Sequence, residues 1–379
     1  MITMNGNDKA VREWYDIKNI DTIDSPSLII YEDRVIENIR ILTSMIDDVG
    51  RLRPHVKTPK SKEAAILMMD AGISKFKCAT IAEAEMLAMI NAPDVLSAYQ
   101  PIGPRLQRFI ALIKGYRDTT FSCLVDNYGS ANSIAETALK NNLEIPVYID
   151  LNVGMNRTGI APGIEAIELY IECISLKGIR PIGLHAYDGH IRMKDFEQRS
   201  KKCNEVLKLV EDTQKELMDK GFPMPVIIAG GTPTFPVYAK IRNVECSPGT
   251  FIFWDAGYER ICPEQPFHAA ALVISRIISM PQKNTLCLDL GHKSIAAEKE
   301  LPDRVRFLNA PDLKFLGHSE EHLVAEAPVG HSYKIGDILY GLPVHICPTV
   351  ALYERASIIK NHEVAEEWRI FARDRKINF

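Results

Sequence analysis

The sequence has no run of about 18 consecutive apolar residues, the length that a helix needs to cross the hydrocarbon core of a membrane. Residues 1–8 are polar and lack the apolar stretch of a secretory signal peptide. The net charge is only −4 over 379 residues, so the basic excess that binds nucleic acid or an anionic membrane surface is also missing. These absences predict a cytoplasmic protein whose partners include neither a membrane nor a nucleic acid.

The eight cysteines include no CxxC pair, and most of them lie inside apolar runs. Buried, reduced thiols explain this distribution better than disulfide bonds do. The chain also lacks internal repeats and low-complexity tracts, and its 46% hydrophobic and 25% charged content is that of an ordinary globular protein. Only Cys347 requires a separate explanation, given below.

From residue 27 to about residue 255, short apolar runs alternate with amphipathic stretches of helical periodicity. The runs expected to be strands are 28–31, 52–56, 76–79, 95–98, 121–125, 147–151, 181–185 and 226–229. Eight alternations over about 230 residues are typical of a (β/α)₈ barrel of the TIM type. A doubly wound open sheet is the competing interpretation, and the number of repeats favours the barrel.

After residue 263 the pattern changes to apolar runs separated by Gly and Pro turns with little helix between them, which predicts a mostly antiparallel β domain. We expect residues 1–25 to pack with this domain, because a strand there would hold down an otherwise loose terminus. The predicted organisation is an α/β chain with a barrel over 26–262 and a β domain formed by 1–25 and 263–379.

Polar and basic side chains follow several predicted strands, and active sites of such barrels lie at the carboxyl ends of the strands. They are Lys57, Arg157 between two glycines, the 185–190 segment with His185, Tyr187 and His190, the 230–232 segment Gly-Gly-Thr, and the 247–250 segment Ser-Pro-Gly-Thr. A lysine in such a place can hold an aldehyde as a Schiff base, and the Gly-Gly-Thr turn before a helix suits a phosphate. Taken singly, each has a structural alternative: a solvated basic loop, a surface salt bridge or a tight turn.

Taken together and in order, these segments resemble the fold-type III pyridoxal-phosphate enzymes, the alanine-racemase-like barrels. The resemblance is closest to their D-threonine aldolase and D-serine dehydratase branch. The matching segments are 53–58 (Arg-Pro-His-Val-Lys-Thr), 154–159 (Gly-Met-Asn-Arg-Thr-Gly), 183–190 (Gly-Leu-His-Ala-Tyr-Asp-Gly-His), 230–234 (Gly-Gly-Thr-Pro-Thr), 248–250 (Pro-Gly-Thr), 319–322 (Ser-Glu-Glu-His) and 345–349 (His-Ile-Cys-Pro-Thr). They span nearly the whole chain.

The resemblance implies a role for each of these positions. Lys57 would carry pyridoxal 5'-phosphate as a Schiff base, Arg157 would bond the phenolic oxygen of the cofactor, and Tyr187 would lie near its ring. The phosphate would be held by Gly231, Thr232, Gly249 and Thr250. The resemblance also implies a homodimer whose active site lies near the interface.

His345 and Cys347 are two residues apart on a segment, 342–350, that is expected to be a strand, so their side chains would share a face. An imidazole nitrogen and a thiolate suit Zn²⁺. The resemblance implies a divalent cation held by a histidine and a second residue two positions on. Zinc is favoured by the cysteine, and manganese is the alternative.

The implied substrate is a small β-hydroxy-D-amino acid, cleaved as by a D-threonine aldolase to glycine and an aldehyde, with His190 as the candidate general base. The alternative is D-serine dehydratase-like elimination to a 2-oxo acid and ammonia. Alanine racemases have an arginine where this chain has Ser247, which makes a racemase a minor alternative. A second minor alternative, a non-catalytic cofactor-binding protein, would need neither the β domain nor the metal pair.

Overall fold

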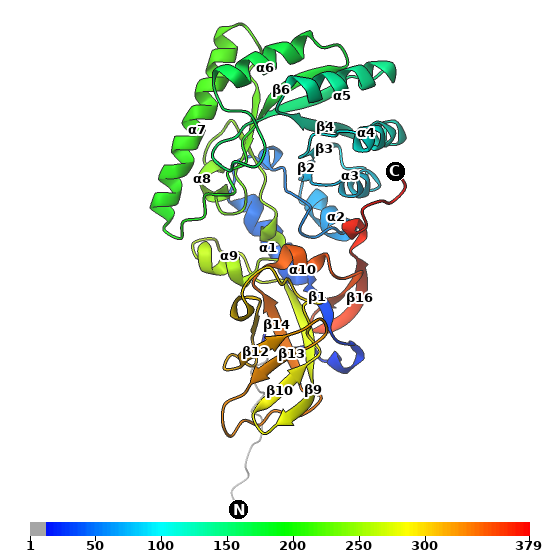
Figure 1. Cartoon of the computed structure of the whole chain (residues 1–379), viewed down its shortest axis with the longest axis vertical. Coiled ribbons are helices and arrows are strands. Elements are labelled where there is room, and N and C mark those ends of the chain that lie inside the picture. The colour runs from blue at the N-terminus through cyan, green and yellow to red at the C-terminus, as the bar shows by residue number, and fades with distance from the viewer. Residues whose placement is uncertain (1–12) are drawn as a thin grey trace, which may run out of the picture.

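The structure is a computed structural model that describes residues 13–379, so the first 12 residues of the predicted 1–25 segment lie outside it. Figure 1 shows two parts, a sheet surrounded by helices and a second, largely helix-free sheet below it. The predicted fold class, an alanine-racemase-like barrel with a mostly antiparallel β domain, is confirmed. No helix within residues 13–379 combines the length and apolar character that crossing a bilayer requires.

The first sheet is a parallel sheet of seven strands arranged in chain order. Its strands are β2 (Lys75–Cys78), β3 (Asp94–Ser97), β4 (Thr120–Val125), β5 (Ile145–Asp150), β6 (Ile179–His185), β7 (Val226–Ala229) and β8 (Val244–Cys246). The extended segment 52–56 lies between its two edges, because Leu52 pairs with Cys246 and His55 pairs with Lys77, both in parallel. This segment therefore closes the barrel.

Helices cover the outside of the barrel. They are α1 (Glu32–Ser44), α2 (Lys62–Asp70), α3 (Ile81–Ala88), α4 (Pro104–Gly115), α5 (Tyr128–Lys140), α6 (Ile164–Ser175), α7 (Phe196–Asp219) and the short α8 (Phe235–Tyr238). Several begin at a capping side chain that accepts a hydrogen bond from the first turn, as Ser61 does for α2 and Thr80 for α3. Their apolar faces pack on the strands and leave the interior of the barrel to the inward-facing side chains.

The second sheet has nine strands and is antiparallel except where β1 (Ser27–Tyr31) pairs with β15. Its other members are β9 (Ala271–Gln282), β10 (Thr285–Leu288), β11 (Val305–Phe307), β12 (Lys314–His318), β13 (Leu323–Glu326), β14 (Ile338–Pro343), β15 (Arg355–Lys360) and β16 (Glu363–Arg369). The short helix α9 (Ala256–Ile261) follows the last barrel strand and precedes β9, and the short helix α10 (Ile346–Val350) lies between β14 and β15; Figure 1 shows α10 at the junction of the two parts.

The strands differ from the prediction at two points. The strand expected over 28–31 exists, but it pairs with β9 and β15 in the second sheet rather than with the barrel. The eighth barrel alternation is completed instead by β8, which was not predicted, because Glu245 interrupts its apolar character. The apolar pattern of a run predicts a strand but does not specify which sheet the strand joins.

The interior of the barrel is layered, as inward-facing side chains of parallel barrels are. At the amino-terminal end, Arg53 contacts both Asp94 (Nη1–Oδ1 2.6 Å) and Glu245 (Nε–Oε2 2.8 Å), and Lys75 also pairs with Glu245. A layer of four buried apolar or aromatic side chains comes next: Leu96, Leu124, Tyr148 and Ile228. The polar residues at the carboxyl end of the barrel lie beyond this layer.

We expect Arg53→Met to lower the free energy of unfolding by about 3–5 kcal/mol, because two carboxylates would lose a fully buried cation. Arg53 is 1% exposed. Urea unfolding of the purified protein measures the effect. The matched control is Arg355→Met, since this arginine also contacts two carboxylates but is 58% exposed, and its loss should change stability by less than about 1 kcal/mol. Equal losses for the two variants would contradict the prediction.

Candidate active site

A cavity of about 590 Å³ opens at the carboxyl ends of the barrel strands. Its lining includes Lys57, Arg157 and Tyr187, three of the residues predicted from the sequence. It also includes Lys77, Asp150 and His185, which were not among the predicted site residues. Concave sites lined by apolar surface and a few convergent polar groups are where small ligands bind.

Three basic side chains lie around the ring of Tyr187. The distance from its centroid is 5.9 Å to Lys57 Nζ, 5.4 Å to Lys77 Nζ and 5.1 Å to Arg157 Cζ. Tyr187 is half-buried and Arg157 is exposed at the mouth of the cavity. Basic side chains around one cavity create a potential that attracts an anionic ligand.

The loop that carries Lys57 is held from both sides. The backbone N–H of Lys60 donates to the carbonyl of Val56 at 3.0 Å, and the Lys60 side chain pairs with the fully buried Glu83. Glu83 in turn accepts a hydrogen bond of 2.6 Å from the backbone of Ala79 at the end of β2. The half-buried Lys57 amine is therefore presented to the cavity from a fixed loop.

The residues predicted to hold a phosphate lie together. The N–H groups of Gly249 and Thr250 both donate to the hydroxyl oxygen of Thr232, each at 3.1 Å. Adjacent amides converging on one oxygen form the kind of concavity that binds a phosphate oxygen. A Cβ at Gly249 would lie 2.8 Å from the carbonyl oxygen of His55, so only glycine fits there. Gly231 lies beside the Tyr187 ring, where a Cβ would be 3.4 Å from Cε2.

These observations test whether pyridoxal phosphate fits the chain. The cavity supplies an amine at Lys57, a cation at Arg157 and a flat aromatic surface at Tyr187, and the 249–250 amides supply anion donors. The donor set matches an aldehyde-bearing aromatic phosphate, so the residues present fit the cofactor.

His345 and Cys347 are close together, but not for the reason predicted. The strand β14 ends at Pro343, and His345 is the N-cap of α10, so the expected strand over 342–350 is wrong. The first turn of a helix, rather than one face of a strand, brings the two side chains together. Cys347 Sγ lies 3.1 Å from the hydroxyl of Thr58 and 3.6 Å from that of Thr250, beside the Lys57 loop and the 249–250 segment.

The electrostatics of this pair favour a thiolate at Cys347 next to a protonated imidazole at His345. Burial raises the pKa of the Cys347 thiol, but the hydrogen bond with His345 and the charge of Lys57 outweigh it and lower the pKa overall. Burial lowers the pKa of His345, whereas its contacts with Cys347 and Glu298 raise it to about 9. Thiolate sulfur and imidazole nitrogen with a nearby carboxylate are donors that suit Zn²⁺. Within residues 13–379 the structure brings together no group of three or more His, Cys, Asp or Glu side chains that could hold a metal ion.

Asp255 fixes the position of the 345–347 segment and was not predicted. This buried carboxylate caps α9 through the N–H of Tyr258 (2.8 Å) and accepts a second bond from the N–H of Ile346 (3.0 Å). One carboxylate thus joins the end of the barrel to the start of α10. A sequence signal existed, since Asp is a preferred N-cap, but the contact with Ile346 spans 91 residues.

His190, the candidate general base, is not among the residues that line the cavity. It is exposed and lies against Gly154, where a Cβ would be 2.8 Å from its Nε2. Partial burial and the charge of Lys202 lower its pKa, which favours the neutral imidazole. Its role as a base remains a prediction.

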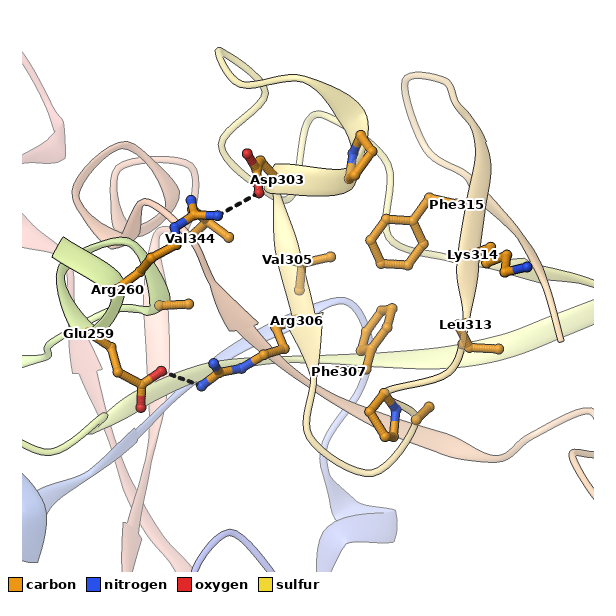
Figure 2. A pocket seen from close by; sticks show the side chains of 14 residues that line it. Glu259, Arg260, Asp303, Val305, Arg306, Phe307, Leu313, Lys314, Phe315 and Val344 are labelled. Carbon is orange, nitrogen blue, oxygen red and sulfur yellow. Dashed lines mark hydrogen bonds and ion pairs between the residues drawn. The ribbon is translucent and has the colours of Figure 1, made fainter. Parts of the chain in front are cut away.

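A second cavity of about 700 Å³ lies between α9, β11 and β12 (Figure 2). Two ion pairs border it, Arg260–Asp303 at 3.0 Å and Arg306–Glu259 at 2.5 Å, and Figure 2 shows the rings of Phe307 and Phe315 on its other side. It contains none of the predicted site residues. The smaller cavity at the strand ends is therefore the candidate active site.

Comparison with known proteins gives two family matches that divide the chain. The family model described as "Alanine racemase, N-terminal domain" matches residues 30–256, and the one described as "Putative serine dehydratase domain" matches residues 270–359. Both lie within the described residues, one on the barrel side and one on the β-domain side.

Individual proteins resemble the chain over nearly its full length. A D-threonine aldolase from Arthrobacter sp. is 25% identical over 93% of this chain and 93% of its own. A D-threo-3-hydroxyaspartate dehydratase from Delftia sp. (strain HT23) is 25% identical over 92% of this chain and 97% of its own. The crystal structure of D-threonine aldolase from Filomicrobium marinum superposes with a TM-score of 0.86, covering 95% and 98% of the two chains at 24% identity, which shows a shared fold. The chain belongs to the alanine racemase N-terminal domain family, the fold-type III pyridoxal-phosphate enzymes.

Proposed function

We propose that this member of the family cleaves β-hydroxy-D-amino acids in the manner of a D-threonine aldolase, using pyridoxal phosphate and a divalent cation. The observation that carries the proposal is the position of Cys347, 3.1 Å from Thr58, the residue after Lys57. A metal-binding pair beside the cofactor lysine suits a substrate that carries a hydroxyl next to its amino carbon.

Each group of residues has a separate task in this proposal. Lys57 would hold the cofactor by its aldehyde, and Arg157 and the 249–250 amides would orient it through its phenolic oxygen and its phosphate. His345 and Cys347 would hold the cation. The bound cofactor supplies an electron sink for breaking a bond at Cα, and the cation supplies Lewis acidity toward the β-hydroxyl group. Zinc suits the donor set, with manganese as the alternative.

Elimination of water to a 2-oxo acid and ammonia is the second candidate. Cys347 supports it, because the resemblance places a cysteine at this position in the dehydratases and often an aspartate in the aldolases. The match of residues 270–359 to a dehydratase domain supports it as well. The aldolase is preferred because the segment after Cys347, Pro-Thr-Val, looks more like the aldolases.

The same proposal includes a homodimer with the active site near its interface. The exposed Arg157 leaves the cavity mouth open in a single chain, which supports a covering partner. Light scattering should then give a mass near twice 42.6 kDa.

The proposal also includes a cytoplasmic location. All eight cysteines are unpaired, which supports the reducing environment of the cytoplasm.

The test is incubation of the cofactor-loaded protein with D-threonine, with and without Zn²⁺ or Mn²⁺, and identification of the products by mass spectrometry. Glycine with acetaldehyde is the expected result, and L-threonine should be left unchanged. Formation of 2-oxobutanoate and ammonia would show that the protein is a dehydratase and not an aldolase. Neither product under any metal, with bulkier β-hydroxy-D-amino acids also unreacted, would contradict both.

A further inference from the structure

A second lysine, Lys77, reaches the candidate active site from inside the barrel. It lies near the end of β2 and is only 4% exposed, yet its side chain lines the cavity. Lys75, two residues earlier on the same strand, is paired with Glu245. Within the part of the chain that the structure describes, Lys77 has no carboxylate partner closer than 4.0 Å. A buried amine without a paired anion is costly unless it serves the site.

Lys77 is bonded instead to a histidine. Its Nζ lies 2.8 Å from Nε2 of His185, and Nδ1 of the same ring lies 2.7 Å from Oδ1 of Asp150. Although burial raises the pKa of Asp150, the hydrogen bond with His185 holds it below the ordinary value. The carboxylate therefore accepts the Nδ1 proton, so Nε2 is left to accept a hydrogen bond from Lys77. The three side chains form one directed chain, Lys77–His185–Asp150.

The surroundings of Lys77 keep both of its protonation states accessible. Burial lowers its pKa most, the charge of Lys57 lowers it further, and the result is about 7. The ionisable groups around it are Lys57, Arg53 and His55 from the 52–57 segment, Asp150 from β5, and His185, Tyr187 and Asp188 from β6 and the loop after it. Asp150 and Asp188 raise its pKa and so offset part of the effect of the cations. An acid–base group works best when its pKa is close to the working pH.

Lys77 and Lys57 face the same space, since both amines lie within 6 Å of the centroid of the Tyr187 ring. A cofactor carried by Lys57 in this cavity would bring the amino acid next to the second amine. His190, by contrast, is exposed and outside the cavity lining. The chain therefore places Lys77, rather than His190, where a proton could be exchanged with the bound substrate.

We propose that Lys77 is the acid–base residue of the reaction, positioned by His185 and Asp150. This rests on the proposed lyase function. The neutral amine of Lys77 takes the proton of the β-hydroxyl, the O–H electron pair forms the aldehyde C=O bond, and the Cα–Cβ bond breaks. The ammonium then returns the proton to Cα, which gives glycine. One group thus accepts and donates a single proton, and no external reagent is needed.

We expect Lys77→Met to lower kcat for D-threonine cleavage about 100-fold or more, with KM changed only a few-fold. Lys77→Arg should be equally impaired, because a guanidinium keeps the charge but does not lose its proton at neutral pH. In the wild-type protein, kcat should rise with pH through a value near 7, because the base must be neutral, and both variants should lose this dependence. The matched control is Lys75→Met, which lies on the same strand but outside the cavity and should keep the wild-type pH profile.

Full activity in Lys77→Arg would overturn the proposal, since it would leave only a role for the charge. Retention of the pH dependence near 7 in Lys77→Met would overturn it as well.

The bound cofactor offers a readout that does not depend on turnover. Its absorption spectrum should titrate near pH 7 in the wild-type protein and in Lys75→Met, and this inflection should disappear in Lys77→Met. If no β-hydroxy-D-amino acid is cleaved but the inflection depends on Lys77, the proposed substrate is wrong and Lys77 is still a proton donor and acceptor of the site. An inflection unchanged in Lys77→Met rejects Lys77 whatever the substrate is.

Asp150→Asn tests the positioning role. Because the Asp150 carboxylate raises the pKa of Lys77, its removal should move the acidic limb of the pH profile to lower pH. A limb that stays in place or moves to higher pH would show that Asp150 does not act on Lys77.

Discussion

Replacement of Lys57 by alanine is expected to abolish the absorption band of covalently held pyridoxal phosphate and to lower kcat at least about 10⁴-fold. The reason is that an active-site nucleophile acts as a unit with its partners. Its removal therefore eliminates nearly all of the rate enhancement that the covalent pathway provides. Of the two lysines on the loop after the extended segment 52–56, Lys57 lines the cavity and Lys60 does not. Absorbance spectroscopy and a coupled assay of aldehyde release measure the two effects.

Reduction with borohydride followed by peptide mapping makes this test residue-specific. In the wild-type protein the pyridoxyl group should be found on Lys57. The control is Lys62→Ala, five residues further along, whose amine lies 4.0 Å from the ring centroid of Phe371 and outside the cavity. This variant should keep the band and the activity. A pyridoxyl group mapped to Lys77 in the wild-type protein would show that the cofactor lysine had been misassigned.

Replacement of His345 by alanine is expected to lower kcat on the order of 10³-fold, because Lewis-acid stabilisation of a hydroxyl oxygen supplies several kcal/mol. The cofactor band should remain, since Lys57 and the 249–250 amides are untouched. Cys347→Ala should act in the same direction. Elemental analysis should find bound metal in the wild-type protein and much less in either variant, and chelation followed by Zn²⁺ or Mn²⁺ should restore only the wild-type activity.

His331→Ala is the control for a histidine of the same domain, since its Nε2 contacts only the Lys283 carbonyl in the structure (2.9 Å) and lies outside the cavity lining. Its metal content and kcat should equal those of the wild-type protein. A His345→Ala variant that keeps both its metal and its activity would show that His345 does not bind the cation. Loss of the cofactor band together with the metal would mean that α10 supports the cofactor loop instead of holding a cation.

The prediction from the sequence was most accurate where a motif is local. Lys57, Arg157 and Tyr187 were expected at strand ends, and all three line one cavity. Thr232, Gly249 and Thr250 also meet as expected, because parallel strands bring their carboxyl ends to one edge. His345 and Cys347 lie close together even though the strand expected for them is a helix turn, since they are only two positions apart in the sequence.

What the sequence by itself determined is the fold class and the grouping of most residues proposed to bind the cofactor, because strand–helix alternation and turn motifs are encoded within a few neighbouring residues. What only the tertiary structure decided is which sheet the strand Ser27–Tyr31 joins, and which side chains meet inside the barrel. Lys77 in Lys-Phe-Lys-Cys looks like the polar side of a half-exposed strand, and its contact with His185 spans 108 residues. The closure of the barrel turns that polar side inward and buries Lys77. No local sequence pattern indicates this burial, which makes Lys77 a candidate for catalysis.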